Sequence, residues 1–257
     1  MTLTKQEERD LVHLLLDMGE MMYCSGSEVK RVENTLSLMG KAYGAVETSV
    51  LVITASIIVT LKFSGGNVVT ESRRVQKSGS NKLWRLERLN ALSRKCCANP
   101  MTISDLDTEI KKCKEPINIM MFYIGSALAA GSFAVFFGGE WYDFIVAAIF
   151  ALLICTMQKT VSHITPNNII FNIVCSFAVG LLISLTAKII PALNVDKIIS
   201  GDTMLLIPGA AFTNAIRDLI VGDTISGVMR LIETILWAIG LGIGFILSIW
   251  LVGGIAI

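Results

Sequence analysis

Residues 198–230 read IISGDTMLLIPGAAFTNAIRDLIVGDTISGVMR, and this stretch decides the fold. It is apolar enough to enter a lipid bilayer, yet Pro208-Gly209 interrupts it and five charged residues lie in it. Proline removes a backbone donor and clashes with the preceding turn, so the stretch predicts two helices that meet at Pro208. Interrupted apolar segments occur at membrane depth only where protein or a water-filled cavity receives the freed backbone groups, and they mark the binding sites of transporters. The stretch therefore indicates a component of membrane transport.

Polar residues on this stretch form the candidate substrate or ion pathway. If Pro208 takes the first position of the second helix, the N–H groups of residues 209–211 are unpaired at the positive end of the helix dipole and can receive a substrate carboxylate. Asn214 lies one turn from Arg217 and from Asp218, so each pair shares a helix face. The predicted pathway residues are Asp202, Pro208, Gly209, Asn214, Arg217, Asp218, Asp223 and Arg230.

Charge within a membrane needs compensation, which leaves two interpretations of these residues. A charged side chain at the bilayer centre costs about 2.5–3.5 kcal/mol, so the charges must lie near an interface, pair with one another or face water. Arg217, Asp218 and Asp223 can form a cluster at a cytoplasmic helix end that only fixes topology. Alternatively, Asp202 and Arg217 take part in the passage of a solute or of protons. Gly222 is expected to end the helix, and Asp223 to cap the next one.

Charge is distributed unevenly along the 257 residues. The chain has 22 Lys and Arg and 21 Asp and Glu, and only 12 of these charged residues follow Pro116, while 53% of all residues are hydrophobic. This step in composition predicts a boundary near Pro116, between a water-soluble domain (residues 1–115) and a transmembrane helical domain (residues 116–257). The first ten residues, MTLTKQEERD, lack the layout of a secretory signal, which places the first domain in the cytoplasm. A net charge of +1 gives no basic field for nucleic acid.

The soluble domain begins with two helical patterns. Thr4-x-x-Glu7 is a capping box that starts a helix ending near Cys24. Ser25-x-x-Glu28 is expected to cap a second helix. The start of that helix is either an anion site made of free N–H groups or an ordinary capped helix with solvated charges. The residues in question are Gly26, Glu28, Arg31 and Glu33.

The rest of the soluble domain adds strands and two more helices. β-Branched residues from Val46 to Phe63 predict one long strand or two short ones, followed by a turn at residues 65–67 and a return strand. Helical spacing returns in residues 81–97 and 104–115. The predicted fold of residues 1–115 is therefore α+β. Six cysteines without a CxxC pair read as reduced thiols, and no acid–base pair or metal-ligand spacing suggests an enzyme or a metal site.

Five apolar segments follow, so the fold class is a multi-pass α-helical membrane protein with an N-terminal cytoplasmic α+β domain. Besides the interrupted stretch, the expected spans are residues 116–139, 144–158, 169–187 and 234–257. Lys and Arg near the span ends favour a cytoplasmic N-terminus and, after five crossings, an external C-terminus. Gly240-x-x-x-Gly244 predicts close approach of two helices in lipid. An odd number of spans without an evident internal repeat suggests a second subunit.

Two segments resemble a known family. CSGSEVKRVENTLSLMGKAYG (residues 24–44) and LLIPGAAFTNAIRDLIVGDTISGVMRLIE (residues 205–233) are similar to the threonine/serine exporter family, in its split, YjjP-like form. The signature positions carried over are Gly26, Glu28, Arg31, Val32, Glu33, Pro208, Gly209, Asn214, Arg217, Asp218, Asp223, Gly227 and Arg230.

The resemblance implies a secondary-active exporter of small hydrophilic metabolites, without a cofactor. Threonine and serine are the substrates expected of the fused form, and a dicarboxylate such as succinate is expected of the split form. The split form also implies a smaller YjjB-like membrane subunit as partner in a hetero-oligomer in the cell membrane. The alternative function is a membrane-anchored ligand sensor or scaffold, in which residues 1–115 are the active part and the spans only anchor them.

Overall fold

The computed structural model describes residues 3–53, 55–75, 82–115, 118–161, 165 and 167–254. Contacts divide the chain into two compact units. The first comprises Met1–Pro116 with Ala210–Ile232, and the second comprises Ile117–Gly209 with Glu233–Ile257. The expected boundary at Pro116 lies outside the described residues, and the division into domains 1–115 and 116–257 stays a prediction.

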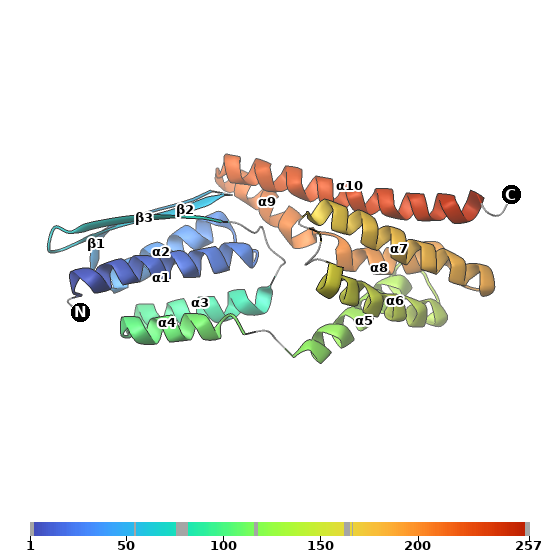
Figure 1. Cartoon of the computed structure of the whole chain (residues 1–257), viewed down its shortest axis with the longest axis horizontal. Helices are drawn as coiled ribbons and strands as arrows, with labels where there is room; N and C mark the ends of the chain where they lie inside the picture. Colours follow the sequence, from blue (N-terminus) through green and yellow to red (C-terminus); the bar gives the residue numbers. More distant parts are fainter. Residues whose placement is uncertain are drawn as a thin grey trace. The chain divides into compact units, whose positions relative to one another are not determined.

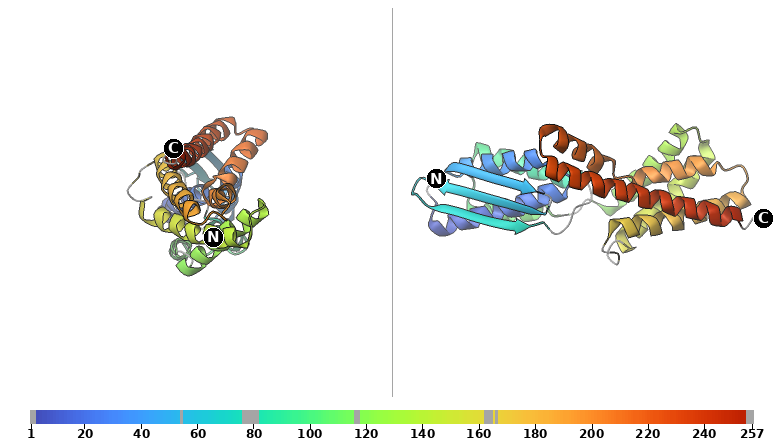
Figure 2. Two further views of the ribbon diagram at one scale, coloured as in Figure 1. Left: turned by 90° about the vertical axis from the view of Figure 1, so that its right-hand side faces the viewer. Right: turned by 90° about the horizontal axis from the view of Figure 1, so that it is seen from above.

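The first unit combines helices with one small sheet (Figure 1). Its described residues form three antiparallel strands in the order β1-β2-β3, so that strands consecutive in the chain are paired (Figure 2). The residues from Val46 to Phe63 therefore form two strands rather than one. Gly66 turns the chain between β2 and β3 with a φ of +79°, a conformation that glycine adopts without steric cost. The elements are α1 (Lys5–Cys24), α2 (Val29–Ala42), β1 (Ala45–Ile53), β2 (Ser56–Phe63), β3 (Val68–Arg74), α3 (Leu83–Ala98) and α4 (Ile103–Lys112).

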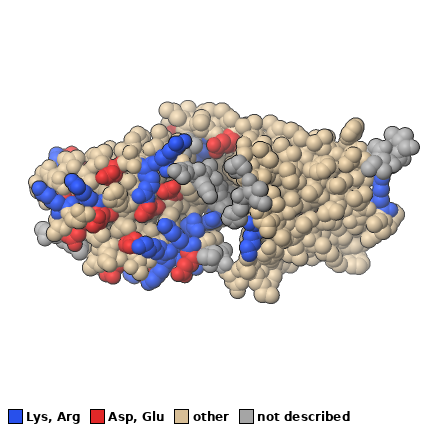
Figure 3. All heavy atoms as spheres, viewed as in Figure 1, with Lys and Arg blue, Asp and Glu red and all other residues tan. Residues whose placement is uncertain are grey.

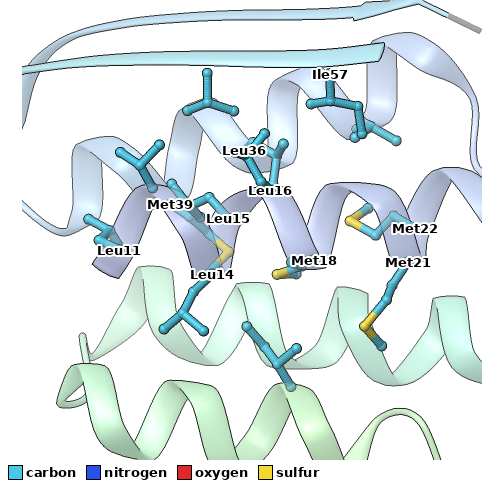
Figure 4. Packing of buried hydrophobic residues seen from close by; sticks show 14 of the residues in the cluster. Leu11, Leu14, Leu15, Leu16, Met18, Met21, Met22, Leu36, Met39 and Ile57 are labelled. Carbon is cyan, nitrogen blue, oxygen red and sulfur yellow. The ribbon is translucent and has the colours of Figure 1, made fainter. Parts of the chain in front are cut away.

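Helix α1 lies at the centre of the first unit's core. The sheet covers it on one side and α3 and α4 on the other, and Figure 4 shows its Leu and Met side chains directed to both. Alternate residues of β2, such as Ile57 and Leu61, are buried against α1 and α2. The helices approach closely at Gly19, where a Cβ atom would lie 2.7 Å from the Leu36 side chain.

The ends of α1 confirm one predicted cap and correct another. Thr4 and Glu7 form the expected capping box. Ser25, however, does not cap α2, because it is the C-cap residue of α1. Gly26 follows with a φ of +94°. Its N–H donates to the Tyr23 carbonyl, and the Ser27 N–H donates to the Met22 carbonyl. This is a Schellman motif, which uses Ser25 to close the first helix, so α2 begins after Glu28 instead.

The second unit is built from apolar helices. They are α5 (Ile119–Phe136), α6 (Trp141–Thr160), α7 (Asn168–Ile189), α8 (Val195–Leu206) and the greater part of α10 (Thr224–Gly254), while α9 (Gly209–Val221) lies almost entirely in the first unit. Helices α5, α6, α7 and α10 are long and apolar enough to cross a membrane, and α8 with α9 form a bent pair that would make a fifth span. On the face shown in Figure 3, charged side chains gather over the first unit and are few over the second.

Helices α7 and α10 pack closely and in parallel. Asn172, near the start of α7, donates to the carbonyl of Trp237 near the middle of α10. Lys188 donates to the carbonyl of Val252 near the C-terminal ends of both helices. A Cβ atom at Gly240 would lie 3.1 Å from the carbonyl oxygen of Ile169. The Gly240-x-x-x-Gly244 segment therefore lies in a close helix contact, as predicted.

Helix α8 runs antiparallel to α5 and begins beside the start of α6. Gly201 faces α5, where an added Cβ would lie 2.5 Å from the carbonyl oxygen of Ala130. At the other end, the Asp143 carboxylate on α6 accepts from the backbone N–H of Asn194 (3.0 Å) and from its side-chain amide (2.9 Å). Asp143 also accepts from the Glu140 N–H at 2.8 Å, so both oxygens of this buried carboxylate accept hydrogen bonds.

Candidate functional site

The interrupted segment is two helices, as Pro208 predicts. Helix α8 ends at Leu206, α9 begins at Gly209, and the pair is bent by 55° at the break. The expectation that the N–H groups of residues 209–211 are all unpaired is wrong for Gly209, whose N–H donates to the Ile207 carbonyl at 2.9 Å. The break thus satisfies one freed donor with a tight local turn.

Asp202 lies on α8, one and a half turns before the break. Its exposed fraction is 0%, and neither carboxylate oxygen has a hydrogen-bond partner among the residues that the structure describes. Helices α5, α6 and α7 all pack against α8. The cysteine side chains of Cys155 on α6 and Cys175 on α7 lie close enough to interact electrostatically with the Asp202 carboxylate. Asp202 is therefore a buried acidic group in a largely apolar surrounding.

Four of the other predicted pathway residues contact the turn between α1 and α2, namely Asn214, Arg217, Asp218 and Arg230. We call residues 23–29 the corner. Helix α9 places Asn214 against it, where the side-chain amide donates to the Gly26 carbonyl at 2.7 Å. Asp218, one turn further on α9, accepts through Oδ1 from the Val29 N–H at 3.3 Å. The prediction that Asn214 and Asp218 share a helix face is confirmed, and this face is turned to the corner.

Arg230 of α10 completes the contact with the corner. Its guanidinium donates to the Asp218 carboxylate at 3.0 Å and to the Ser27 carbonyl at 3.1 Å. Its Nε donates to the Tyr23 hydroxyl at 3.1 Å, and the guanidinium carbon lies 4.1 Å from the centre of the Tyr23 ring. Only 9% of the Arg230 side chain and 2% of the Asp218 side chain are exposed. This is a buried, charge-assisted network with a cation–π contact.

The start of α2 is thus an anion site, and the anion that occupies it is the Asp218 carboxylate of the same chain. Glu28, the N-cap residue, makes no cap hydrogen bond with its own side chain. An acidic group near a helix N-terminus is stabilised by the free N–H groups and by the helix dipole. Asp218 fills this role from 189 positions away in the sequence.

The remaining candidates lie around the corner or support it. Glu28 forms an ion pair with Arg217 at 2.8 Å, and 62% of the Arg217 side chain stays exposed. Glu33 accepts from the Val52 N–H at 3.0 Å, which joins α2 to β1, while Arg31 is exposed. Gly222 ends α9 with a φ of +100°, as expected. The Gly227 N–H donates to the Asp223 carbonyl, which places Asp223 at the N-cap position of α10, but its Oδ2 has no hydrogen-bond partner among the described residues, so a side-chain cap by Asp223 stays a prediction.

The structure therefore sorts the predicted site residues into two groups. Asp202 belongs to the second unit, whereas Arg217, Asp218 and Arg230 belong to the first and contact the corner. Tyr23 and Ser27 could not be selected from local sequence patterns, because their partner Arg230 lies more than 200 positions away. The one local signal was the Ser25-Gly26 turn, which indicates a helix end but not a receptor for Arg230.

Within the described part of the chain, four apolar helices of spanning length and a fifth, interrupted segment with buried charges define a multi-pass α-helical membrane protein. Comparison with known proteins then gives its family. The family described as "Putative threonine/serine exporter" (ThrE) matches residues 13–252, and the chain belongs to it. The predicted resemblance is confirmed. Members of this family are described as exporters rather than enzymes.

Individual relatives are distant in sequence. The "Threonine/serine exporter" of Corynebacterium glutamicum is 22% identical over 250 residues, which cover 93% of this chain and 51% of that protein. The "Probable succinate transporter subunit YjjP" of Klebsiella aerogenes is 21% identical over 241 residues, covering 91% of this chain and 89% of that protein. The "Pheromone-regulated membrane protein 10" of Kluyveromyces lactis is 22% identical over 262 residues, covering 96% and 26%. The chain thus spans about half of the first protein and about a quarter of the third. No solved structure matches the chain.

Proposed function

We propose that the chain is a subunit of a secondary-active exporter of small hydrophilic metabolites, either amino acids of the threonine and serine type or a dicarboxylate such as succinate. It works with a smaller YjjB-like membrane subunit in the cell membrane, with residues 1–115 in the cytoplasm. The family and the names of two relatives support this proposal. The word "subunit" in the name of the Klebsiella relative supports the partner.

The interrupted segment is the observation that carries the transport function. Helices α7 and α10 are parallel, so a chain that leaves the membrane at the end of α7 must cross back before α10 begins. The 12 residues of α8 rise only about 18 Å, which is short of a hydrocarbon core of about 30 Å. We therefore assign the return crossing to α8, the break and the first turn of α9, before Asn214 reaches the corner, which makes five crossings. A loop that re-enters and leaves on the same side would make α10 antiparallel to α7.

We assign two binding positions for a solute carboxylate to α9. The first is the start of the helix, where the N–H groups of residues 210 and 211 point toward the break. The second is Arg217, whose guanidinium is held by Glu28 on one side and is otherwise exposed. Arg217 lies eight positions after Gly209, which is about 12 Å along a helix. The two binding positions therefore bind the carboxylate one after the other and not at the same time.

Transport is tested with the chain and its partner subunit reconstituted together in lipid vesicles. Counterflow of labelled succinate, threonine and serine is measured for the wild type and for Pro208→Ala, which restores a backbone donor at the break, and for Arg217→Ala. Gly242→Ala is the matched control, because a Cβ there meets nothing within 4 Å. We expect wild-type rates from the control and strongly reduced counterflow from both other variants. Wild-type counterflow in Pro208→Ala and Arg217→Ala would show that neither proposed position binds the solute carboxylate.

The sensor alternative predicts that none of these solutes crosses the membrane in the presence of any partner. Deletion of residues 1–110 is a poor test between the two functions. It removes Tyr23, Ser27 and Val29, and so leaves Arg230 and Asp218 without the corner that binds them. Pro208→Ala and Arg217→Ala leave residues 1–110 in place, so a loss of transport in these variants cannot be caused by loss of the corner.

A further inference from the structure

Asp202 and Asp143 are two buried carboxyl groups of the second unit with opposite surroundings. Both side chains belong to residues with an exposed fraction of 0%. Asp143 accepts three hydrogen bonds from N–H groups of Glu140 and Asn194. Asp202 accepts none from the described residues and forms no ion pair with a described basic side chain. Only Asp143 therefore has surroundings that stabilise a negative charge.

Among the described residues, the elements packed against Asp202 offer no compensating charge. On α5, the backbone next to Gly201 belongs to the small residues Ala130 and Ala134. The titratable groups that interact with the carboxylate are the thiols of Cys155 on α6 and Cys175 on α7, which are uncharged when protonated. The described residues contain no group of three metal-ligating side chains around it. An ionised carboxylate in such a place costs several kcal/mol, whereas the neutral acid costs much less.

We propose that Asp202 is the proton-carrying site of the transporter. In the described conformation the carboxyl group holds a proton and is therefore neutral. When the helices around α8 open, water reaches the group, the O–H bond breaks and the proton passes to water, leaving the carboxylate. The assignment of this proton to transport rests on the proposed function, whereas the protonated state of Asp202 does not.

Infrared spectroscopy tests the protonated state without any transport assay. The full chain in lipid vesicles is compared with Asp202→Asn, which is isosteric with the neutral acid and preserves the packing. The wild-type minus variant spectrum should contain the carbonyl band of one protonated carboxyl group at neutral pH, and this band should disappear as the pH is raised. Asp143→Asn is the matched control, because it changes the hydrogen-bonded carboxyl group of the same unit and should leave the Asp202 band in place. A wild-type spectrum in which Asp202 contributes carboxylate bands at every accessible pH would overturn the proposal.

Transport then tests the use of the proton. In vesicles that also contain the partner subunit, Asp202→Asn should retain solute counterflow but lose accumulation driven by a proton gradient. Wild-type accumulation by Asp202→Asn would overturn the coupling role. If the wild type transports none of the solutes while the acid band is present, the proposed function fails and the protonation of Asp202 stands.

Discussion

Replacement of Asp218 by alanine should open the corner of residues 23–29. The variant removes the carboxylate that lies 3.0 Å from the Arg230 guanidinium and the acceptor of the Val29 N–H. Removing one partner of a buried ion pair typically costs about 3–5 kcal/mol, because the other charge stays buried. Loss of a helix N-terminal acceptor adds about 1 kcal/mol, and less where the bond is long, as it is at 3.3 Å. A total of about 4 kcal/mol corresponds to a thousandfold change in an opening equilibrium.

Hydrogen-exchange mass spectrometry of peptides covering residues 23–33 measures that equilibrium in the intact protein. Arg217→Ala is the matched control, since it also removes an ion pair between α9 and the corner. That pair is largely exposed and is worth at most about 1 kcal/mol, so protection should fall about fivefold or less. The double variant Asp218→Ala with Arg230→Met should lose less protection than Asp218→Ala alone, because no unpaired cation is left. Equal exchange in Asp218→Ala and Arg217→Ala would refute the reasoning.

Three further predictions concern packing, backbone conformation and a thiol. Gly244→Ala should prevent the contact of α7 with α10 and lower the yield of folded protein in detergent, because its Cβ would lie 2.6 Å from the Ile173 carbonyl oxygen. Gly242→Ala should leave the yield unchanged, because a Cβ there meets nothing within 4 Å. Gly26→Ala should destabilise the corner by about 1 kcal/mol through its φ of +94°, measured by exchange as above, whereas Gly65→Ala should have no such effect. Burial raises the pKa of the Cys24 thiol from 9.0 to about 11, so the rate of its alkylation should keep rising up to pH 11. Between pH 9 and 11 only the unfolded chain has lost this proton, so Cys24 should lower the stability of the folded state as the pH rises through that range. An alkylation rate that levels off at pH 9 would contradict this.

Local features of the fold could be predicted because their causes lie within a few residues of one another. The Thr4 capping box, the end of α9 at Gly222 and the helix break at Pro208 each depend on side chains or backbone groups one turn apart. The close contact at Gly240-x-x-x-Gly244 was also predictable, since two small residues one turn apart allow a helix to approach. The start of α2 was misplaced because Ser25 satisfies the sequence rule for a helix start and also the rule for a helix end.

The length of the last helix could not be predicted from the sequence, for a different reason. Its span was expected to begin near Thr234, after the last charged residue, but α10 starts at Thr224 and has 31 residues. At 1.5 Å per residue it is about 46 Å long, more than a bilayer core of about 30 Å requires. Arg230 does not interrupt it because the corner supplies hydrogen-bond acceptors and an aromatic face. No local pattern contains that information.

The charged residues of the interrupted segment look alike in the sequence, but their surroundings give them different capacities. Asp218 and Arg230 neutralise each other, and changing the charge of either would leave its partner buried and unpaired. Their network is therefore suited to holding α9 and α10 to the corner and poorly suited to exchanging protons. Asp202 has no such partner among the described residues, so its gain or loss of a proton breaks no ion pair. A group that must alternate between two charge states during transport needs this freedom, which is why we assign the proton to Asp202 and not to Asp218.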